Sequence, residues 1–232
     1  MVTFMKKKLF AMFCALALLV SALPCAGALE GEAARAADTL AALNLVKGTG
    51  SGYALDEPAT RAQAAVLLVR LAGAEQEAAS SGSRSSFRDA PAWCRSYITY
   101  AASQKWIYGV TAQAFRPDET VTANAWCTFL LRMLGYSDHD GDFTVGRAAL
   151  FAQWIRLLPR SDDGPLTRGD LFQIMRDALT FSYKNGSATV IQRLIQRGAC
   201  SQSAASALGL LSQELTARQV ADRYTSAVFC LD

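Results

Sequence analysis

The segment that decides the fold begins with TRAQ (residues 60–63), continues as the apolar run AAVLLV (64–69) to Leu71, and closes at Gly73. A threonine followed three residues later by glutamine is typical of a capping box at a helix start. The apolar run predicts a buried helix, and the glycine predicts its end. We therefore predict a buried helix that begins after Thr60 and stops before Gly73.

Two further copies of this pattern follow. Thr122 precedes an apolar segment that Gly135 closes, and Thr167 precedes the apolar segment 171–179. In the first two copies the closing glycine lies 13 residues after the threonine. Upstream, two short apolar sequences end in glycine: LVKG at 45–48 and WIYG at 106–109. The pattern predicts an internal repeat made of a helix, a glycine-bearing loop and a second helix.

Helix pairs of this kind cannot bury their apolar faces alone, so they form a core by packing together. We expect an all-α fold in which three helix-loop-helix repeats share one core. The segment after the first repeat is rich in Ser, Gly and Glu and predicts a linker. The expected boundaries are a signal peptide at 1–28, repeat 1 at 29–74, a linker at 75–86, repeat 2 at 87–137, repeat 3 at 138–200 and a tail or the start of a further domain at 201–232.

The N-terminus has the pattern of an export signal. Three lysines at 6–8 are followed by an apolar run at 9–23, by Pro24, and by Ala-Gly-Ala at 26–28. This order is typical of a secretory signal peptide, and we expect cleavage after Ala28. A membrane anchor is the alternative, but the run is shorter than the roughly 20 residues that span a bilayer. Pro24 disfavours a lipoprotein signal at Cys25.

Composition argues against several function classes. The formal net charge of +3 belongs to the signal, because cleavage removes three of the 23 basic residues and leaves as many basic as the 20 acidic residues. A neutral chain lacks the basic surface of a nucleic-acid-binding protein. No other apolar stretch is long enough to span a membrane. His139 is the single histidine, which limits histidine-based catalysis and metal binding, so we expect no enzyme activity and no cofactor.

Several ordered motifs resemble those of S-layer homology (SLH) modules. TRAQ (60–63) and TRGD (167–170) resemble the family's TRAE motif. FRDAPAW (87–93) is similar to the F-x-D-V-x-x-W opening of such a module, and FRPDETVT (115–122) is similar to the F-x-P-x-x-x-I-T approach to TRAE. The resemblance covers roughly residues 30–200, with the motifs at the family's spacing.

The resemblance implies a pseudo-threefold bundle whose grooves between repeats bind secondary cell-wall polysaccharide. That polymer often carries negatively charged pyruvyl ketals, and the TRAE arginine is implicated in holding it. Matched by motif, the arginines here are Arg61 and Arg168. Repeat 2 departs from the motif as TANA (122–125), so its groove has lost the cation. At most two competent grooves are expected.

The position of these arginines has a physical meaning of its own. Arg61 and Arg168 lie in the first turn of their predicted helices, where a cation opposes the helix dipole at a cost of roughly a few tenths of a kcal/mol. One interpretation is an anionic partner, bound together with free N–H groups of the helix start. The other is a salt bridge between repeats, to a carboxylate such as Asp56 or Asp118.

Four more residues are candidates for the polysaccharide site because they match family motifs: Gly48, Gly109, Asp89 and Trp93. A loop glycine lets a sugar approach the backbone closely, but either glycine could instead be only a helix C-cap. Asp89 could equally be a helix N-cap, and Trp93 a core residue.

Two loops resemble ligand sites and are set aside. GTGSG (48–52) lacks the preceding strand and the GK[ST] of a phosphate-binding loop, so it predicts a turn. DHDGD (138–142) alternates carboxylates as calcium loops do, but Phe143 and Ala149 stand where an EF-hand needs glycine and glutamate. We expect a solvated loop with His139 exposed and no dedicated metal site; adventitious cation binding stays open.

Four cysteines remain once the signal is removed, and in an exported chain they could pair in three ways. Cys127 occupies the repeat position that Ala65 and Phe172 hold in the other copies, so it acts as a small buried hydrophobe. We expect buried thiols rather than disulfides at the four positions Cys94, Cys127, Cys200 and Cys230.

The tail does not continue the repeats. LTARQVA (215–221) predicts a short helix capped by Thr216, and SAVFCL (226–231) predicts the start of a strand. This edge weakly resembles the entry of trypsin-like exported peptidases, which follow SLH arrays in some bacteria. The other interpretation is a disordered tail.

These observations predict a secreted protein at the bacterial cell wall or cell surface. It would anchor itself non-covalently by binding anionic, pyruvylated secondary cell-wall polysaccharide. One alternative is the targeting half of a truncated or split SLH-peptidase, with a cargo or peptidase domain beyond the C-terminus. Another is a surface interaction scaffold that keeps the fold without binding sugar.

Overall fold

The computed structural model describes residues 26–48, 50, 52–81, 85–158 and 163–211. The chain divides into two compact units, 1–32 and 33–232, and the packing described below lies within the second. Within the described ranges the regular structure is helical, which confirms the all-α prediction. Its helices are α2 (Ala26–Ala42), α3 (Arg61–Leu71), α4 (Glu75–Ser80), α5 (Arg95–Ser103), α6 (Ala123–Met133), the 3-10 turn η1 (Val145–Arg147), α7 (Ala148–Trp154), α8 (Arg168–Ala178), α9 (Val190–Gln196) and α10 (Gln202–Ala207).

The three long apolar helices begin where their threonines predict. Thr60, Thr122 and Thr167 are the N-caps of α3, α6 and α8, and each hydroxyl accepts a hydrogen bond from the third backbone N–H of its helix. The capping box is complete at α3 and at α8, since Gln63 and Asp170 each accept from the N–H of the capping threonine. These local bonds satisfy N–H groups that a helix start otherwise leaves unpaired.

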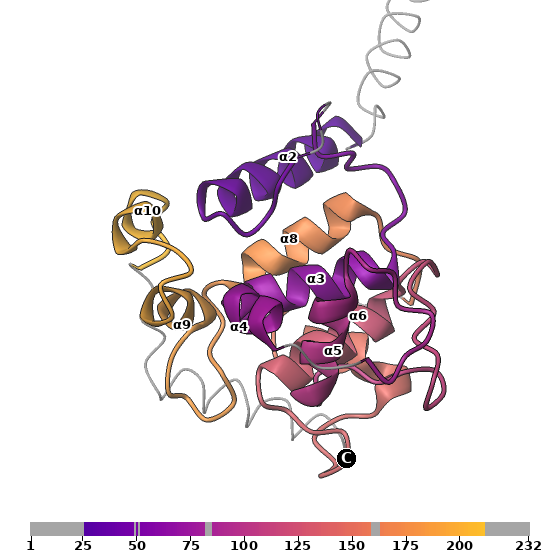
Figure 1. The fold of residues 1–232 in the computed structure, drawn as a ribbon. Coiled ribbons are helices and arrows are strands. Elements are labelled where there is room, and N and C mark those ends of the chain that lie inside the picture. The colour runs from indigo at the N-terminus through magenta and orange to yellow at the C-terminus, as the bar shows by residue number, and fades with distance from the viewer. Residues whose placement is uncertain (1–25, 49, 51, 82–84, 159–162, 212–232) are drawn as a thin grey trace, which may run out of the picture. The chain divides into compact units, whose positions relative to one another are not determined.

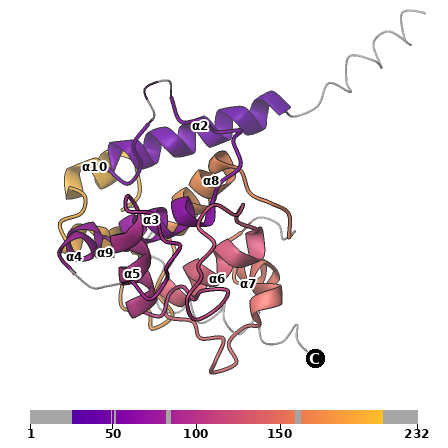
Figure 2. The ribbon, with the colours of Figure 1, turned by 45° about the vertical axis from the view of Figure 1, so that its right-hand side comes forward.

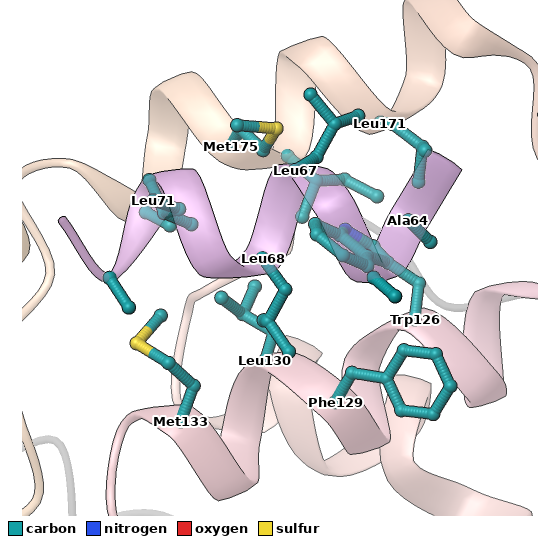
Figure 3. Close-up of a cluster of buried hydrophobic side chains, with 14 of the residues drawn as sticks. Ala64, Leu67, Leu68, Leu71, Trp126, Phe129, Leu130, Met133, Leu171 and Met175 are labelled. Carbon is teal, nitrogen blue, oxygen red and sulfur yellow. The ribbon is translucent and has the colours of Figure 1, made fainter. Parts of the chain in front are cut away.

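The core forms where α3, α6 and α8 meet (Figure 1). Figure 3 shows Leu68 of α3 directed toward Leu130 of α6, while Leu67 lies near Leu171 of α8. Trp126, which is fully buried, lies between these helices. Burial of this kind stabilises the fold by about 25 cal/mol per Å² of apolar surface removed from water.

A closed ring of backbone hydrogen bonds joins the segments that lead into the three helices. Ala59 donates its N–H to the carbonyl of Leu166 at 2.9 Å, Leu166 donates to Val121 at 2.9 Å, and Val121 donates to Ala59 at 2.8 Å. Each segment thus binds both of the others. This cyclic pattern supports the pseudo-threefold arrangement, which stays a prediction.

The first helix of each repeat also ends in the same way. The residues that follow α2, α5 and α7 reverse the chain in the left-handed region: Asn44 has φ 60°, Lys105 has φ 61° and Arg156 has φ 62°. The residue after each donates its N–H to a carbonyl in the last turn of the helix, at 2.8 to 3.0 Å. These bonds satisfy helix C-terminal carbonyl groups.

The predicted linker at 75–86 is only partly a linker, because its first half forms α4. Glu75 accepts hydrogen bonds from Arg70 and from the hydroxyl of Tyr97, and Ala78 is buried. The acidic residues in its first turn also suit the helix dipole. Ser, Gly and Glu content alone therefore gave a wrong expectation for this stretch.

After α8, the third apolar helix, come two helices that were not predicted from the sequence, α9 and α10. α9 begins with a capping box formed by Thr189 and Gln192. Figures 1 and 2 both place α9 beside α4, and Arg197 joins the two by donating to the Gly73 carbonyl and pairing with Glu77. The predicted signal segment 1–25 and the predicted peptidase-like edge within 212–232 lie outside the described residues.

Cys94, Cys127 and Cys200 are free and buried, as predicted, whereas Cys230 lies outside the described residues. Burial raises the pKa of the Cys94 thiol to about 11 and that of Cys127 to about 12. None of the helices in the described ranges has the length and apolar character needed to cross a bilayer.

Candidate functional site

The starts of α3 and α8 do not offer free N–H groups, contrary to one expectation. Arg61 and Ala62 donate theirs to carbonyls of the segment before α6, each at 2.9 Å, and the third N–H is bonded to the capping threonine. At α8, Arg168 and Gly169 donate to carbonyls of the segment before α3, at 2.9 and 2.8 Å. A neighbouring extended segment thus occupies each helix start, and a ligand must be held by side chains.

Both arginines bind a loop of another repeat. Arg61 Nε donates to the carbonyl oxygen of Phe115 at 3.0 Å, and Arg168 Nε donates to that of Tyr53 at 2.8 Å. Within the described part of the chain, neither guanidinium has a carboxylate oxygen within the 4.0 Å of an ion pair. The salt bridge to Asp56 or Asp118 is therefore wrong. Among the described residues each arginine forms its side-chain hydrogen bond through Nε, which leaves the terminal NH₂ groups for another partner.

Arg168 lies in a groove of 320 Å³ that is formed by four segments of the chain. Trp93, with 59% of its surface exposed, contributes an aromatic wall. Val46 and Lys47, from the loop after α2, also line the groove. The remaining lining residues come from α3, α5 and α8: Gln63, Val66, Leu67, Arg70, Tyr97, Leu171 and Phe172. Apolar walls with a few convergent polar groups are typical of a ligand site.

The groove carries an excess of positive charge. Arg70 is paired with Glu75 at 3.1 Å, and the Tyr97 hydroxyl donates to the same carboxylate at 2.6 Å. Burial would raise the pKa of Glu75, but the hydrogen bond from Tyr97 and the charge of Arg70 lower it overall. Glu75 therefore stays ionised and neutralises Arg70, whereas the groove's other two cations, Lys47 and Arg168, have no ion-pair partner among the described residues.

Arg61 has different surroundings. Its guanidinium lies over the rings of Phe115, at 4.7 Å, and Phe129, at 5.4 Å. Burial lowers the pKa of Arg61, and the charges of Glu119 and Asp89 partly oppose that shift. Arg116, which is also nearby, is paired with Glu119 at 2.9 Å. Cations and carboxylates are balanced around Arg61.

Asp89 orders the loop beside Arg61. Its carboxylate accepts from the N–H of Phe115 at 2.9 Å and from that of Arg116 at 2.8 Å. Burial would raise the pKa of Asp89, but these backbone hydrogen bonds, with the charge of Arg61, lower it overall. The N-cap alternative for Asp89 is wrong, because the residue before α5 is Cys94.

The two candidate glycines differ in what surrounds them. A Cβ on Gly109 would lie 2.4 Å from the Thr111 carbonyl oxygen and 2.7 Å from that of Ala114, so this glycine is required by its own loop. A Cβ on Gly48 would lie 3.3 Å from the carbonyl oxygen of Gly52 and 3.8 Å from the ring of Tyr53, which is much less crowded. The helix C-cap alternative is wrong for both, because α2 ends at Ala42 and α5 at Ser103, six residues before each glycine.

The start of α6, where the motif lacks arginine, is occupied by other polar groups. Asn124 donates its N–H to the carboxylate of Asp163 at 3.2 Å and its side-chain amide to the Gly146 carbonyl at 3.1 Å. Its side-chain oxygen accepts from the N–H of Ala149 at 2.9 Å. An amide therefore joins the repeats here, and a carboxylate lies at the helix start.

The loop DHDGD (138–142) uses its carboxylates within the protein. Asp138 forms a bidentate pair with Arg132, with both distances 2.7 Å, and Asp142 pairs with Lys184. His139 is exposed, as expected. Among the described residues, no cluster of three metal-ligating side chains occurs here or elsewhere.

The structure thus divides the predicted site residues into two groups. Arg168 and Trp93 both line the 320 Å³ groove. Gly48 is next to Lys47, which also lines it. Arg61, at the start of α3, binds the loop of repeat 2 that Asp89 orders and that contains Gly109. Sequence reasoning missed Lys47, Gln63, Tyr97 and Phe172 as groove residues. Lys47 could have been found from the sequence, because it directly precedes the candidate residue Gly48.

Comparison with known proteins agrees with this architecture. Residues 30–65 match the S-layer homology domain family. The chain is 30% identical over 157 residues to the middle cell wall protein of Brevibacillus brevis, which covers 65% of this chain and 15% of that protein. It is 30% identical over 171 residues to the cell surface protein of Thermoanaerobacter kivui, covering 71% of this chain and 22% of that protein. It is 33% identical over 100 residues to the surface layer protein of Brevibacillus choshinensis.

The chain spans less than a quarter of the length of these relatives. The aligned regions, of 100 to 171 residues, are longer than the segment 30–65 that matches the family. The capped helix start at Thr60, the loop before it and most of α2 fall within the matched range. Residues 30–65 are therefore an S-layer homology domain.

Proposed function

We propose that this chain anchors an exported protein to the bacterial cell wall by binding an anionic secondary cell-wall polysaccharide in the groove of Arg168. The observation that carries the proposal is that one groove combines the exposed ring of Trp93 with Lys47 and Arg168, which form no ion pair among the described residues. The family match and the names of the relatives support a role at the cell surface.

The chemistry of the groove suits a sugar that bears a carboxylate, as a pyruvyl ketal does. The Nε of Arg168 is already bonded to Tyr53, so the orientation of the guanidinium is fixed before a ligand binds. Its terminal NH₂ groups can form charge-assisted hydrogen bonds with a carboxylate, and Lys47 adds a second cation. The apolar face of a sugar ring can pack on Trp93, while Gln63 offers a polar contact.

Sedimentation with purified cell walls tests the proposal. Walls of Brevibacillus brevis are incubated with the protein, and a second sample is treated with mild acid, which hydrolyses the ketals. We expect the protein to bind intact walls and to lose binding on treated walls. Arg168→Gln should weaken wall binding at least tenfold, and Trp93→Ala should weaken it severalfold.

Arg147→Gln is the matched control, because Arg147 is exposed on η1 and outside the groove. It should bind as the wild type does. If the wild type fails to bind intact walls, the interaction-scaffold hypothesis is favoured over anchoring. If Arg168→Gln binds normally, the groove is not the site.

A further inference from the structure

We infer that the two motif arginines have different functions: Arg168 binds the anion, and Arg61 is a structural arginine whose surroundings are closed to anions by Asp89 and Glu119. The inference rests on the proposed function and specifies its stoichiometry. Arg61 and Arg168 then supply one anion site between them, where the motif pattern alone allows two.

The starting point is the geometry that the two arginines share. Each follows a capping threonine, and each donates its Nε–H to the carbonyl of a residue in a loop of another repeat. The bond at Arg61 spans 54 residues of sequence and the bond at Arg168 spans 115. A structural function therefore explains both arginines equally, and only their surroundings can separate them.

The surroundings of Arg61 leave little need for an external anion. Two aromatic faces, those of Phe115 and Phe129, lie against the guanidinium, and both supply the electron-rich surface that a cation prefers. Glu119 and Asp89 are close enough to act on its charge, against one nearby cation, Arg116, which is itself paired with Glu119. A cation that is already stabilised by aromatic rings and two carboxylates gains less from a third anion.

Asp89 is the residue that opposes a ligand most directly. It holds the N–H groups of Phe115 and Arg116, so it is fixed in the loop that Arg61 binds. Because its pKa is lowered, it is ionised at neutral pH. A ligand carboxylate that reaches Arg61 would come close to a like charge, and the repulsion offsets the attraction of the arginine.

Arg168 has the opposite surroundings. Phe172 is the ring beneath it, at 5.8 Å, and the other charged residues that line the groove are Lys47 and Arg70, of which Arg70 is paired with Glu75. Glu75 is paired with Arg70, and it also interacts with the charge of Lys47. Among the described residues Lys47 and Arg168 form no direct ion pair, and an external anion supplies one.

Titration calorimetry with a defined ligand tests the inference. The probe is a methyl glycoside with a 4,6-linked pyruvyl ketal, and the control is the neutral 4,6-isopropylidene glycoside. We expect one binding site per chain for the ketal and no binding of the control. Arg168→Gln should lower the affinity at least tenfold, and Arg61→Gln should change it less than twofold. Asp89→Asn should expose a second, weaker site, because asparagine keeps an acceptor for the loop N–H groups but has no charge.

A measurement on the wild type avoids the risk that Arg61→Gln unfolds. In a ¹H–¹⁵N spectrum, the Arg168 Nε–H signal should shift as the ketal is added, and that of Arg61 should stay in place. Two sites in the wild type, equal shifts of both signals, or an unchanged single site in Asp89→Asn would overturn the inference while leaving wall anchoring intact. Absence of any ketal binding by the wild type would instead contradict the proposed function.

Discussion

The guanidinium of Arg168 donates from Nε to the carbonyl oxygen of Tyr53 at 2.8 Å, across 115 residues of sequence. The bond joins the start of α8 to the loop after α2, and it leaves the outer edge of the guanidinium free for a ligand. One side chain therefore serves both the fold and the proposed site.

Arg168→Lys separates these two functions. Lysine keeps the charge but lacks the planar fork that holds Tyr53 while facing the groove. We expect a loss of about 1 kcal/mol in the free energy of unfolding, measured by urea denaturation, because one hydrogen bond is lost. Wall binding should be weakened less than in Arg168→Gln. If both variants lose binding equally, the geometry of the guanidinium matters more than its charge.

Thr167→Ala tests the capping box of α8. The threonine hydroxyl accepts from the N–H of Asp170 at 3.1 Å and donates to its carboxylate at 2.8 Å. Removal of an N-cap side chain of this kind costs about 1 kcal/mol of stability. Thr144→Ala is the control, because Thr144 precedes η1 without a side-chain capping bond. Equal urea midpoints for the two variants would show that the box adds nothing.

Local signals explain what could be predicted from the sequence. A capping threonine and its partner are three residues apart, and a closing glycine follows its helix directly, so these patterns lie within one window of sequence. The positions of α3, α6 and α8 followed from them. The groove did not, because Lys47, Trp93 and Arg168 meet only through the packing of three repeats.

The helix at 75–80 is a second feature that local sequence patterns could not predict. Its composition is that of a linker, but Glu75 is held by Arg70 and Tyr97. Tyr97 lies 22 residues away along the chain. Contacts with residues distant in sequence stabilise this helix, although its own helix propensity is weak. The sequence of the segment itself gives no sign of those contacts.

Leu68→Ala tests the shared core. Leu68 is fully buried, and Figure 3 shows it directed from α3 toward Leu130 of α6. Truncation of a buried leucine leaves a cavity and costs about 2–5 kcal/mol. Leu208→Ala, at a position that is 37% exposed, should cost far less. A small effect of Leu68→Ala on the urea midpoint would contradict a core built on these helices.

Cys94 and Cys127 should resist alkylation in the folded protein. Burial raises their pKa to about 11 and about 12, so only about one Cys94 thiol in a thousand is ionised at pH 8, and the thiolate is the reactive form. Iodoacetamide at pH 8, followed by peptide mass spectrometry, should find both unmodified. In guanidinium chloride both should react fully. Rapid labelling without denaturant would show that these thiols are accessible.

The pair of Asp138 and Arg132 predicts a contribution to stability that depends on pH. Hydrogen bonds from Arg132 lower the pKa of Asp138 in the folded chain, whereas an unfolded aspartate titrates near about 3.9. The folded state then binds fewer protons, so the contribution is fully present above the unfolded pKa and is lost as the pH falls through the folded value. Asp138→Asn should lower the urea midpoint at pH 7 and flatten its fall below about pH 4. Asp140→Asn, two residues away and exposed, should follow the wild-type profile. An acid limb unchanged in Asp138→Asn would mean that this pair does not set the acid sensitivity of the fold.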